Sequence, residues 1–424
     1  TGAELAWAAN QVNQRHAITG IKIAKDIDLG NQPWTPIGYG TYFTGKIDGQ
    51  GYHIYNMYIN KSDLTEKSNF AGFIGGTNSE SCDIININLS GKIDIPASVA
   101  QKTQVGSFVG KANALGNMIN CHSDVEINIM GAPAYVGGVL AFMKNANIKN
   151  CSYSGNITIA TSGKVTNGIG GILGCTNSST TGIEAVINGC YFDGSIKNNG
   201  SGIPKYVAGI NSYSNLSKAA ETITNNYVIG TIDCTATDQG TVYGKTNTTN
   251  FDCENNYYYA DYTLTGKGGI LMKIEEFHSG EVAYLLNGDQ MEFLFGQELD
   301  SDDNMPVVYR GSNRVYKTIF MYNDNEYAVL YNNTEMKFPK NPVPDDSPTF
   351  EGWYDEKGNR YDGNSTTQTD LTLYAKIVAT GTDNLKTKDK ISINNNKIDI
   401  NSESEIGDIT IWNIHGTKVI NKTI

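Results

Sequence analysis

The stretch GGVLAFMKNANIKNCSYSGNI, residues 137–157, holds two short units that recur along the first part of the chain. The first unit, at residues 137–141, follows a small-small-apolar-apolar-small pattern. Its copies begin at residues 71, 106, 137, 170 and 208, so the steps between them are 35, 31, 33 and 38 residues. A step of this length, built from β-prone segments without a helical period, predicts a solenoid.

The second unit follows each first unit and has a glycine at its eighth position in most copies. It runs from an apolar residue, through a polar one, to a fourth position that is most often cysteine. Its copies are Ile84 to Ile93, Met118 to Ile127, Ile148 to Ile157, Ile187 to Ile196 and Ile223 to Ile232, with Ile87, Cys121, Cys151, Cys190 and Asn226 at the fourth position.

Each step therefore holds three short strands separated by turns, which make one coil of a parallel β-helix. The crossover rule predicts a right-handed coil. Because equal positions in successive coils stack about 4.8 Å apart, we expect Cys121, Cys151 and Cys190 to form an interior ladder of reduced thiols. A metal or redox site is the alternative, although none of the seven cysteines forms a CxxC pair.

The remaining segments fit around this solenoid, and the predicted fold class is all-β. Residues 3–16 have an amphipathic helical pattern and are expected to cap one end, and a short helix at residues 274–287 is expected to be the other cap. The solenoid with its caps then covers residues 1–315. Residues 316–378 form a small β domain, and residues 379–424 form a polar linker with a β tail.

Composition excludes several function classes. The chain has 32 basic and 44 acidic side chains and a net charge of −12, which disfavours binding to nucleic acid phosphates or anionic lipid. Abundant Gly (46) and Tyr (25) agree with turn-rich β structure. No apolar run approaches the roughly 18 residues of a membrane span, so we expect no membrane insertion.

The opening of the chain resembles GLUG-motif proteins. The resemblance rests on DIDL at 26–29, WTPIG at 34–38, FTG at 43–45 and IDGQG at 47–51, together with the Gly-rich repeats, and covers about residues 1–315. It implies a right-handed β-helix exported to the surface of Bacteroidetes or Firmicutes. Some such proteins are described as adhesins or as parts of immunoglobulin A peptidases.

Two further resemblances lie in the C-terminal part. FEGWY at 350–354 with LTLYAK at 371–376 resembles the Listeria–Bacteroides (internalin B type) repeat, a small β-grasp-like module of surface proteins. ITIWNIHG at 409–416 is similar to the C-terminal sorting domain of Bacteroidetes secretion. The module implies a core made of Phe350, Trp353, Leu371, Leu373 and Tyr374. All three resemblances imply a secreted or cell-surface location.

Signatures of catalysis are missing from the sequence. None of the five histidines is followed by glutamate, so there is no HExxH zinc motif, and there is no Gly-x-Ser-x-Gly nucleophile elbow. A polysaccharide lyase or hydrolase stays open as an alternative, since paired carboxylates on neighbouring coils are invisible in sequence. Candidates are Asp124, Glu126 and Asp193. No arginine lies between Arg15 and Arg310 to grip a uronate, which argues against a lyase.

Aromatic clusters provide the candidate binding residues. Tyr39 and Tyr42 crowd an early turn, and Tyr257, Tyr258 and Tyr262 lie where the repeats decay. Stacking on sugar rings is the functional interpretation, and packing at an edge or cap is the alternative.

These observations predict a non-catalytic, exported, adhesin-like protein. We expect it to be a monomer, without cofactor or metal, that binds a host surface protein or glycan through a face of the β-helix. The alternatives are a polysaccharide-degrading β-helix enzyme and a non-catalytic part of an immunoglobulin A peptidase-like protein.

Overall fold

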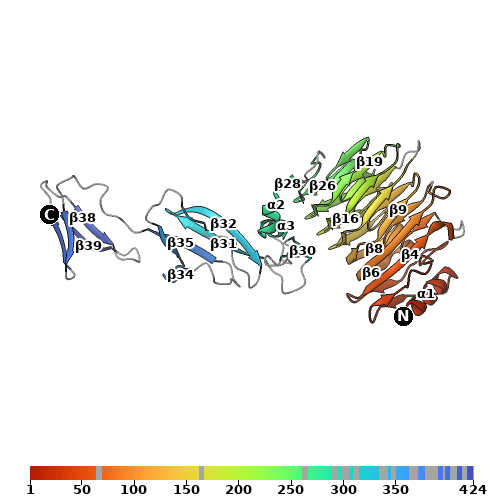
Figure 1. Cartoon of the computed structure of the whole chain (residues 1–424), viewed down its shortest axis with the longest axis horizontal. Helices are drawn as coiled ribbons and strands as arrows, with labels where there is room; N and C mark the ends of the chain where they lie inside the picture. Colours follow the sequence, from red (N-terminus) through yellow and green to blue (C-terminus); the bar gives the residue numbers. More distant parts are fainter. Residues whose placement is uncertain are drawn as a thin grey trace. The chain divides into compact units, whose positions relative to one another are not determined.

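The computed structural model describes residues 1–63, 69–100, 102–161, 167–259, 266–287, 294–297, 305–308, 315–333, 342–344, 350–361, 371–377, 390–394, 397–401, 408–412 and 418–423. The chain divides into two compact units (Figure 1). The first comprises Thr1–Gln297 and Asp303–Asn313, and the second comprises Glu298–Asp302 and Arg314–Ile424. The predicted domain boundaries at residues 315 and 378 remain predictions.

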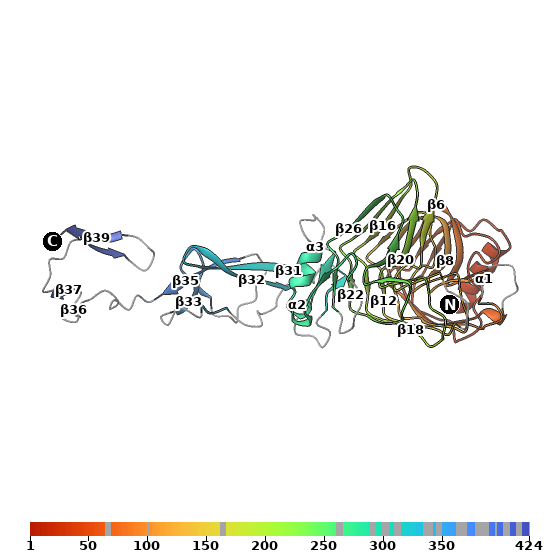
Figure 2. The same cartoon turned by 90° about the horizontal axis from the view of Figure 1, so that it is seen from above.

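The first unit is a parallel β-solenoid, as predicted. One of its sheets has six strands, one from each coil, and every neighbouring pair is parallel (Figures 1 and 2). The predicted right-handed sense rests on the crossover rule. The six strands are β5 (Phe70–Ala71), β7 (Gln104–Gly106), β10 (Tyr135–Gly137), β14 (Gly168–Gly170), β19 (Tyr206–Ala208) and β24 (Asp238–Gly240).

The strand register shows that the predicted series of first repeat units was wrong at its first and its last copy. The sequence analysis missed a sixth copy at residues 240–244, where Thr241 and Tyr243 disguise the pattern. The first copy is also one residue shorter than expected. Ala71 pairs with Val105, whereas Ile74 pairs with Val109.

The strands of the second repeat unit belong to the sheet that has the most strands. Ile148 lies opposite Met118 on one side and Ile187 on the other, and the same row continues through Ile223 to Cys253. All these strands are parallel. Their bounds are β6 (Ile74–Ile95), β8 (Val109–Ser123), β11 (Ala146–Lys149), β16 (Glu184–Asn188), β21 (Ala220–Thr224) and β26 (Asn250–Glu254).

The coils contain more strands than the predicted three. After β11 come β12 (Ser152–Tyr153) and β13 (Asn156–Ile159), followed by β14 and then by β15 (Thr176–Ser178). The third sheet consists of β15, β20 (Asn211–Leu216) and β25 (Tyr243–Thr246). The prediction was wrong because the second unit is bent by sharp corners that cut it into separate strands.

Asparagine makes one of these corners. The residue before the fourth position has a positive φ in every coil, and asparagine and glycine adopt this left-handed backbone most readily. Neighbouring amides also stack: Asn120 Nδ2 donates to Asn86 Oδ1 at 3.0 Å, and Asn255 Nδ2 donates to Asn225 Oδ1 at 2.6 Å. The φ values are 57° at Asn86, 52° at Asn120, 53° at Asn150, 65° at Gly189, 57° at Asn225 and 50° at Asn255.

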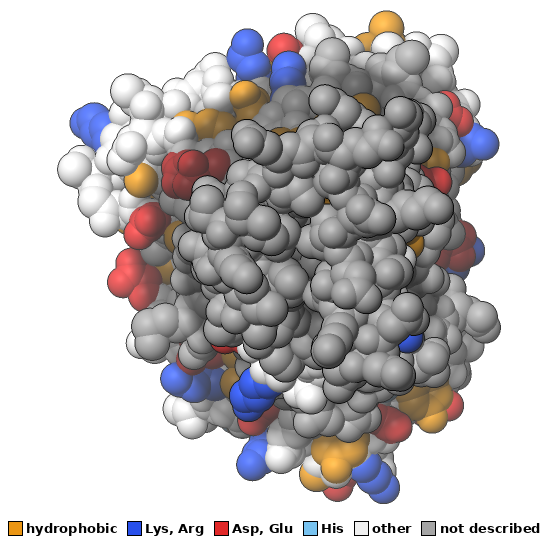
Figure 3. Space-filling view, turned by 90° about the vertical axis from the view of Figure 1, so that its left-hand side faces the viewer, with side chains coloured by type: hydrophobic (Ala, Val, Ile, Leu, Met, Phe, Trp, Pro, Cys, Tyr) orange, Lys and Arg blue, Asp and Glu red, His pale blue; other side chains and the backbone are white. Residues whose placement is uncertain are grey.

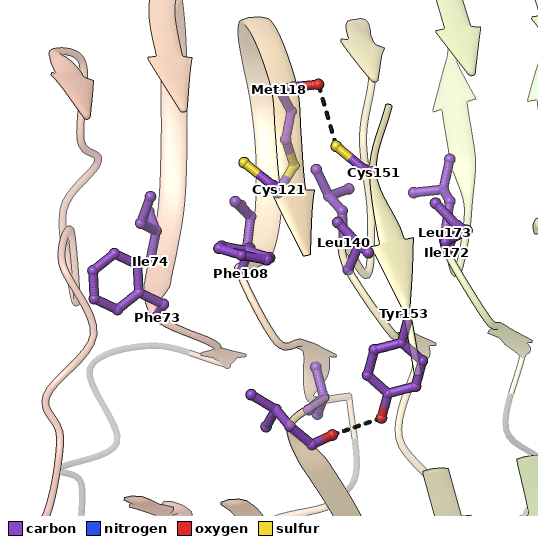
Figure 4. Packing of buried hydrophobic residues seen from close by; sticks show 14 of the residues in the cluster. Phe73, Ile74, Phe108, Met118, Cys121, Leu140, Cys151, Tyr153, Ile172 and Leu173 are labelled. Carbon is purple, nitrogen blue, oxygen red and sulfur yellow. Dashed lines mark hydrogen bonds between the residues drawn. The ribbon is translucent and has the colours of Figure 1, made fainter. Parts of the chain in front are cut away.

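The fourth-position side chains form an interior ladder, which confirms the predicted stack of free thiols (Figure 4). Each thiol lies between a main-chain carbonyl of the preceding coil and one of its own coil, two residues earlier in the chain. Cys151 Sγ lies 3.5 Å from the carbonyl oxygen of Met118, and Cys190 Sγ lies 3.7 Å from that of Ile148. Burial raises the pKa of both thiols, so they stay protonated and can donate.

Asparagine continues this ladder where cysteine ends. Asn226 Nδ2 donates to the carbonyl oxygen of Ile187 at 3.1 Å, and Asn256 Nδ2 donates to that of Ile223 at 2.8 Å. In addition, Asn226 Oδ1 accepts the N–H of Cys190 at 2.8 Å. An amide N–H, which is a stronger donor than a thiol, therefore makes the bond that a thiol makes in earlier coils.

Helices lie at both ends of the solenoid (Figure 1). Helix α1 (Gly2–Asn13) buries Leu5, Ala9 and Val12, as its pattern predicts. The expected second helix is two helices, α2 (Ile274–His278) and α3 (Glu281–Asn287), because Gly280 between them has a φ of 86°. They pack against the asparagine corner of the last coils, where Asn255 Nδ2 donates to the carbonyl oxygen of Leu285 at 2.8 Å.

The second unit contains a mixed five-stranded sheet with the order β32-β31-β35-β33-β34. Its central pair, β31 and β35, is parallel, and the outer pairs are antiparallel. Two separate hairpins follow. The bounds are β31 (Val315–Tyr322), β32 (Asn325–Asn333), β33 (Phe350–Tyr354), β34 (Arg360–Tyr361), β35 (Leu371–Ile377), β36 (Lys390–Asn394), β37 (Lys397–Asn401), β38 (Asp408–Trp412) and β39 (Lys418–Thr423).

The core of this sheet agrees with the predicted set in all but one residue. Trp353 is 2% exposed, packs edge-on against Phe320 and donates from Nε1 to the carbonyl oxygen of Pro342. Leu373 is buried, and Phe350 and Leu371 pack against the same cluster. Tyr374 is 39% exposed, so its predicted core role is wrong. Successive side chains of a strand point to opposite faces, and Leu373 takes the inner one.

A carboxyl group is enclosed in the solenoid interior. Glu221 is fully buried, and its Oε1 accepts hydrogen bonds from Thr176 Oγ1 at 2.6 Å and Asn211 Nδ2 at 2.9 Å. Burial raises its pKa from 4.5 to about 7, because these bonds only partly replace the hydration of the charged form.

Glu221 should make the solenoid less stable as the pH rises. The stability from the protonated form is fully present below pH 4.5 and is lost as the pH rises through about 7. At about 1.4 kcal/mol per pKa unit, the loss is about 3 kcal/mol.

Urea unfolding of wild type and Glu221→Gln at pH 5 and pH 8 measures this loss of stability. The variant should lack this loss, while Glu126→Gln, at an exposed position, should keep it. Equal pH dependence in wild type and Glu221→Gln would contradict the assignment.

Candidate functional site

The structure does not gather the predicted tyrosines into one site. Tyr39 is 7% exposed, and its hydroxyl accepts a hydrogen bond from Lys61 Nζ at 3.2 Å. Tyr257 and Tyr258, in the last coils, are 6% and 9% exposed. Tyr42 is partly buried in the early turn, and Tyr262 lies outside the described residues. Burial of three of these rings favours the packing alternative over sugar stacking.

The candidate carboxylates lie exposed along one face. In the strand register, Ser123 pairs with Tyr153, and Tyr153 pairs with Phe192. Asp124 and Asp193 therefore occupy equivalent positions in two coils that have one further coil between them. With about 4.8 Å per coil, their backbones lie about 10 Å apart. Glu126 instead accepts a hydrogen bond from Asn128 Nδ2 at 2.8 Å.

A different set of aromatic side chains is brought together on the outside of the solenoid. On the six-stranded sheet, Val105, Val136 and Val207 point inward and are fully buried. The residues before them therefore point outward and form one row in register. This row is Phe70, Gln104, Tyr135, Gly168, Tyr206 and Asp238.

A second outer row lies beyond the Gly-rich bend of each coil. Its members are in register through the pairs Gly76–Lys111, Met143–Thr176 and Tyr213–Lys245. From the second coil onward each member follows the first glycine or alanine of its repeat unit by five residues. The row is Gly76, Lys111, Phe142, Cys175, Tyr213 and Lys245.

The two rows touch each other, so the outer surface folds inward along this line. Tyr206 stacks on Tyr213 with ring centroids 4.3 Å apart and planes 11° apart. Tyr135 lies 5.9 Å from Phe142 in a tilted arrangement. We call Phe70, Tyr135, Phe142, Tyr206 and Tyr213 the aromatic corner. All five side chains are partly exposed.

Glycine makes the aromatic corner possible. A Cβ on Gly137 would lie 1.9 Å from the carbonyl oxygen of Leu140, and one on Gly170 equally close to that of Leu173. A side chain at Gly137 or Gly170 would therefore have to shift the bend, whereas the fifth copy holds Ala208 at the equivalent position. The next glycine faces the interior instead: a Cβ on Gly138 would lie 2.3 Å from the ring of Tyr153.

Charge along the aromatic corner is uneven. At one end Lys111 Nζ lies 5.0 Å from the ring centre of Phe70 and 5.6 Å from that of Phe142. Burial, and then the charge of Lys144, lower the pKa of Lys111. At the other end Asp238 pairs with Lys245 at 4.0 Å and with Lys267 at 3.8 Å.

The aromatic corner offers binding chemistry. Partly exposed rings beside amide, carboxylate and ammonium groups suit a ligand with apolar faces and polar edges. Among the described residues, no group of three or more His, Cys, Asp or Glu side chains could hold a metal ion. In the view of Figure 3, basic and acidic side chains of the described residues are interspersed.

Sequence reasoning missed this site although a signal was present. Tyr135 and Tyr206 each precede a repeat unit by two residues, and Phe142 and Tyr213 each follow the start of that unit by five. Aromatic side chains thus recur at fixed offsets in the third and fifth copies. Only the structure shows that the side chains at these two offsets touch each other, along the line where the outer surface folds inward.

Comparison with known proteins gives one similarity. The chain is 25% identical over 232 residues to an immunoglobulin A1 protease of Streptococcus sanguinis. The match covers 53% of this chain but 11% of that protease. No family model and no solved structure matches the chain. None of the helices in the described part of the chain is both long enough and apolar enough to cross a membrane.

Proposed function

We propose that this protein is a non-catalytic, exported cell-surface protein of the adhesin type, and that it binds a host glycan through the aromatic corner. The observation that carries the proposal is the pair of outer rows in register, with aromatic rings that stay partly exposed. Solenoids commonly use extended surfaces of this kind for binding.

The spacing of the rings supports a glycan rather than a compact ligand. Tyr135 and Tyr206 lie two coils apart, or about 10 Å at 4.8 Å per coil. Two neighbouring sugars of an oligosaccharide can span this distance. The stacked pair Tyr206 and Tyr213 is held by its own contact, so little conformational entropy is lost on binding. A host surface protein is the other partner that the binding screen below can reveal.

Export and a surface location are supported by resemblance. The GLUG-type repeats, the internalin-type module and the sorting-domain-like tail all imply a secreted or surface protein. The similarity to a streptococcal immunoglobulin A1 protease agrees with these resemblances. We propose a monomer because a solenoid of this length can present its binding face alone.

Loss of two rings should weaken glycan binding without unfolding the chain. Tyr206→Ala and Tyr213→Ala each remove a partly exposed ring, and a stacking contact is worth about 0.5–1.5 kcal/mol. The double variant should therefore bind the best ligand of a glycan array about tenfold more weakly or worse. The array and a titration of its best ligand measure this effect.

The matched control is Tyr52→Ala, which removes a tyrosine that is 38% exposed elsewhere on the solenoid. It should bind as wild type does, and all variants should keep the wild-type far-ultraviolet circular dichroism spectrum, because the lost stack costs only about 0.5–1.5 kcal/mol of stability. Wild-type binding by the double variant would contradict the site. Binding by the wild type to host proteins alone would replace the glycan with a protein partner.

A second candidate is a non-catalytic part of an immunoglobulin A peptidase-like protein, which the partial similarity favours. The sequence has no HExxH motif. We therefore expect the purified chain to leave immunoglobulin A1 intact, with or without added zinc, in a gel assay where a functional immunoglobulin A1 protease is the positive control. Cleavage that depends on metal and is abolished by a point change in this chain would contradict a non-catalytic role.

The polysaccharide-degrading alternative depends on Asp124 and Asp193. Inverting glycosidases place two carboxyl groups roughly 6.5–9.5 Å apart, close to the spacing of these two positions. Release of reducing ends from the bound glycan, lost in Asp124→Asn and Asp193→Asn, would establish this alternative over simple binding.

A further inference from the structure

Lys111 holds an unusual position on the aromatic corner. Its ammonium lies near the faces of Phe70 and Phe142, which belong to coils on either side of its own. It forms no ion pair with any carboxylate of the described residues. Lys144, from the next coil, adds a second positive charge close enough to lower the pKa of Lys111.

The other end of the corner shows the contrast. Lys245 occupies the same row as Lys111, but it has Asp238 at 4.0 Å, and Lys267 also pairs with this carboxylate. The corner thus has one end with paired charges and one end where a partly buried cation lies against two rings with a second lysine nearby. Because aromatic faces stabilise an ammonium less than a carboxylate does in a desolvated site, this cation retains the capacity to bind an anion.

We infer that the ligand of the aromatic corner is an acidic glycan whose carboxylate or sulfate group meets Lys111. This inference rests on the proposed function and adds the class of sugar. A lysine recognises an anion as a point charge, without the bidentate geometry of arginine, so either acid group fits. The net charge of −12 on the chain disfavours a dense polyanion. A sugar with isolated acid groups therefore fits better than a heavily charged polymer.

Partial burial strengthens this recognition. Surface ion pairs contribute little because water screens them, whereas a charge between two rings is screened less. An anion bound there would raise the lowered pKa of Lys111 again. Binding should therefore weaken at alkaline pH, where the free protein loses this proton.

Calorimetric titration of the full chain with three probes tests the inference. The probes are sialyllactose, which carries one carboxylate, its methyl ester as the neutral match, and lactose that carries one sulfate. At least one acidic probe should bind about tenfold or more tightly than the neutral one. Lys111→Met should remove this preference and Lys111→Arg should keep it. The charge control Lys197→Met, at an exposed position of β18 (Ser195–Asn198), should bind as wild type does.

Each outcome has a distinct meaning. A preference for sialyllactose identifies a carboxylate and a preference for the sulfated lactose identifies a sulfate, and both support the inference. Equal binding of acidic and neutral probes, or an unchanged preference in Lys111→Met with a wild-type melting temperature, overturns the acidic class but leaves glycan binding intact. If neither these probes nor a glycan array shows binding, the proposed function and the inference both fail.

Discussion

The hydrogen bond from the fourth-position side chain to the carbonyl of the preceding coil is the contact on which the solenoid depends. Strand pairing satisfies the main chain within each sheet, but at the asparagine corner the chain turns, and the N–H of Cys190 binds the side-chain oxygen of Asn226. A buried main-chain group without a partner costs about 1–3 kcal/mol. The thiols of Cys121, Cys151 and Cys190 and the amides of Asn226 and Asn256 also lie within hydrogen-bond distance of a strand carbonyl in the preceding coil, and so tie each coil to the one before it.

This contact also fixes the outer surface. Because side chains pair with the coil before them, each coil must stack in register, and the Gly-rich bends then align as well. Aligned bends place Tyr206 against Tyr213 and Tyr135 against Phe142. The proposed binding site is therefore a consequence of interior hydrogen bonds and of glycines that permit a close bend. Its residues are otherwise free to vary, as Gln104, Gly168 and Asp238 in the same row show.

Much of the fold could be predicted from the sequence because solenoid contacts are local in the repeat. The length of the repeat was enough to predict that Cys151 stacks between Cys121 and Cys190, because residues one repeat apart occupy equal positions in neighbouring coils. The sixth copy at Gly240 escaped notice because Thr241 and Tyr243 replace the small and the apolar residue of the pattern. The aromatic corner could not be predicted, since spacing does not tell which side of a bend is concave. The predicted residues Tyr39, Tyr257 and Tyr258 are buried, and a cluster of rings in sequence is equally typical of packing.

Replacement of Asn226 tests the central claim most directly. Its amide donates to the carbonyl oxygen of Ile187 and accepts from the N–H of Cys190. Asn226→Ala leaves the N–H of Cys190 without its acceptor and removes the additional donor to the Ile187 carbonyl, so it should lower the free energy of unfolding by about 1–3 kcal/mol. Asn226→Cys restores the residue type of the preceding coils and should recover a large part of this loss. Urea unfolding followed by far-ultraviolet circular dichroism measures both variants. If alanine and cysteine destabilise the solenoid equally, the side-chain ladder does not hold the coils in register.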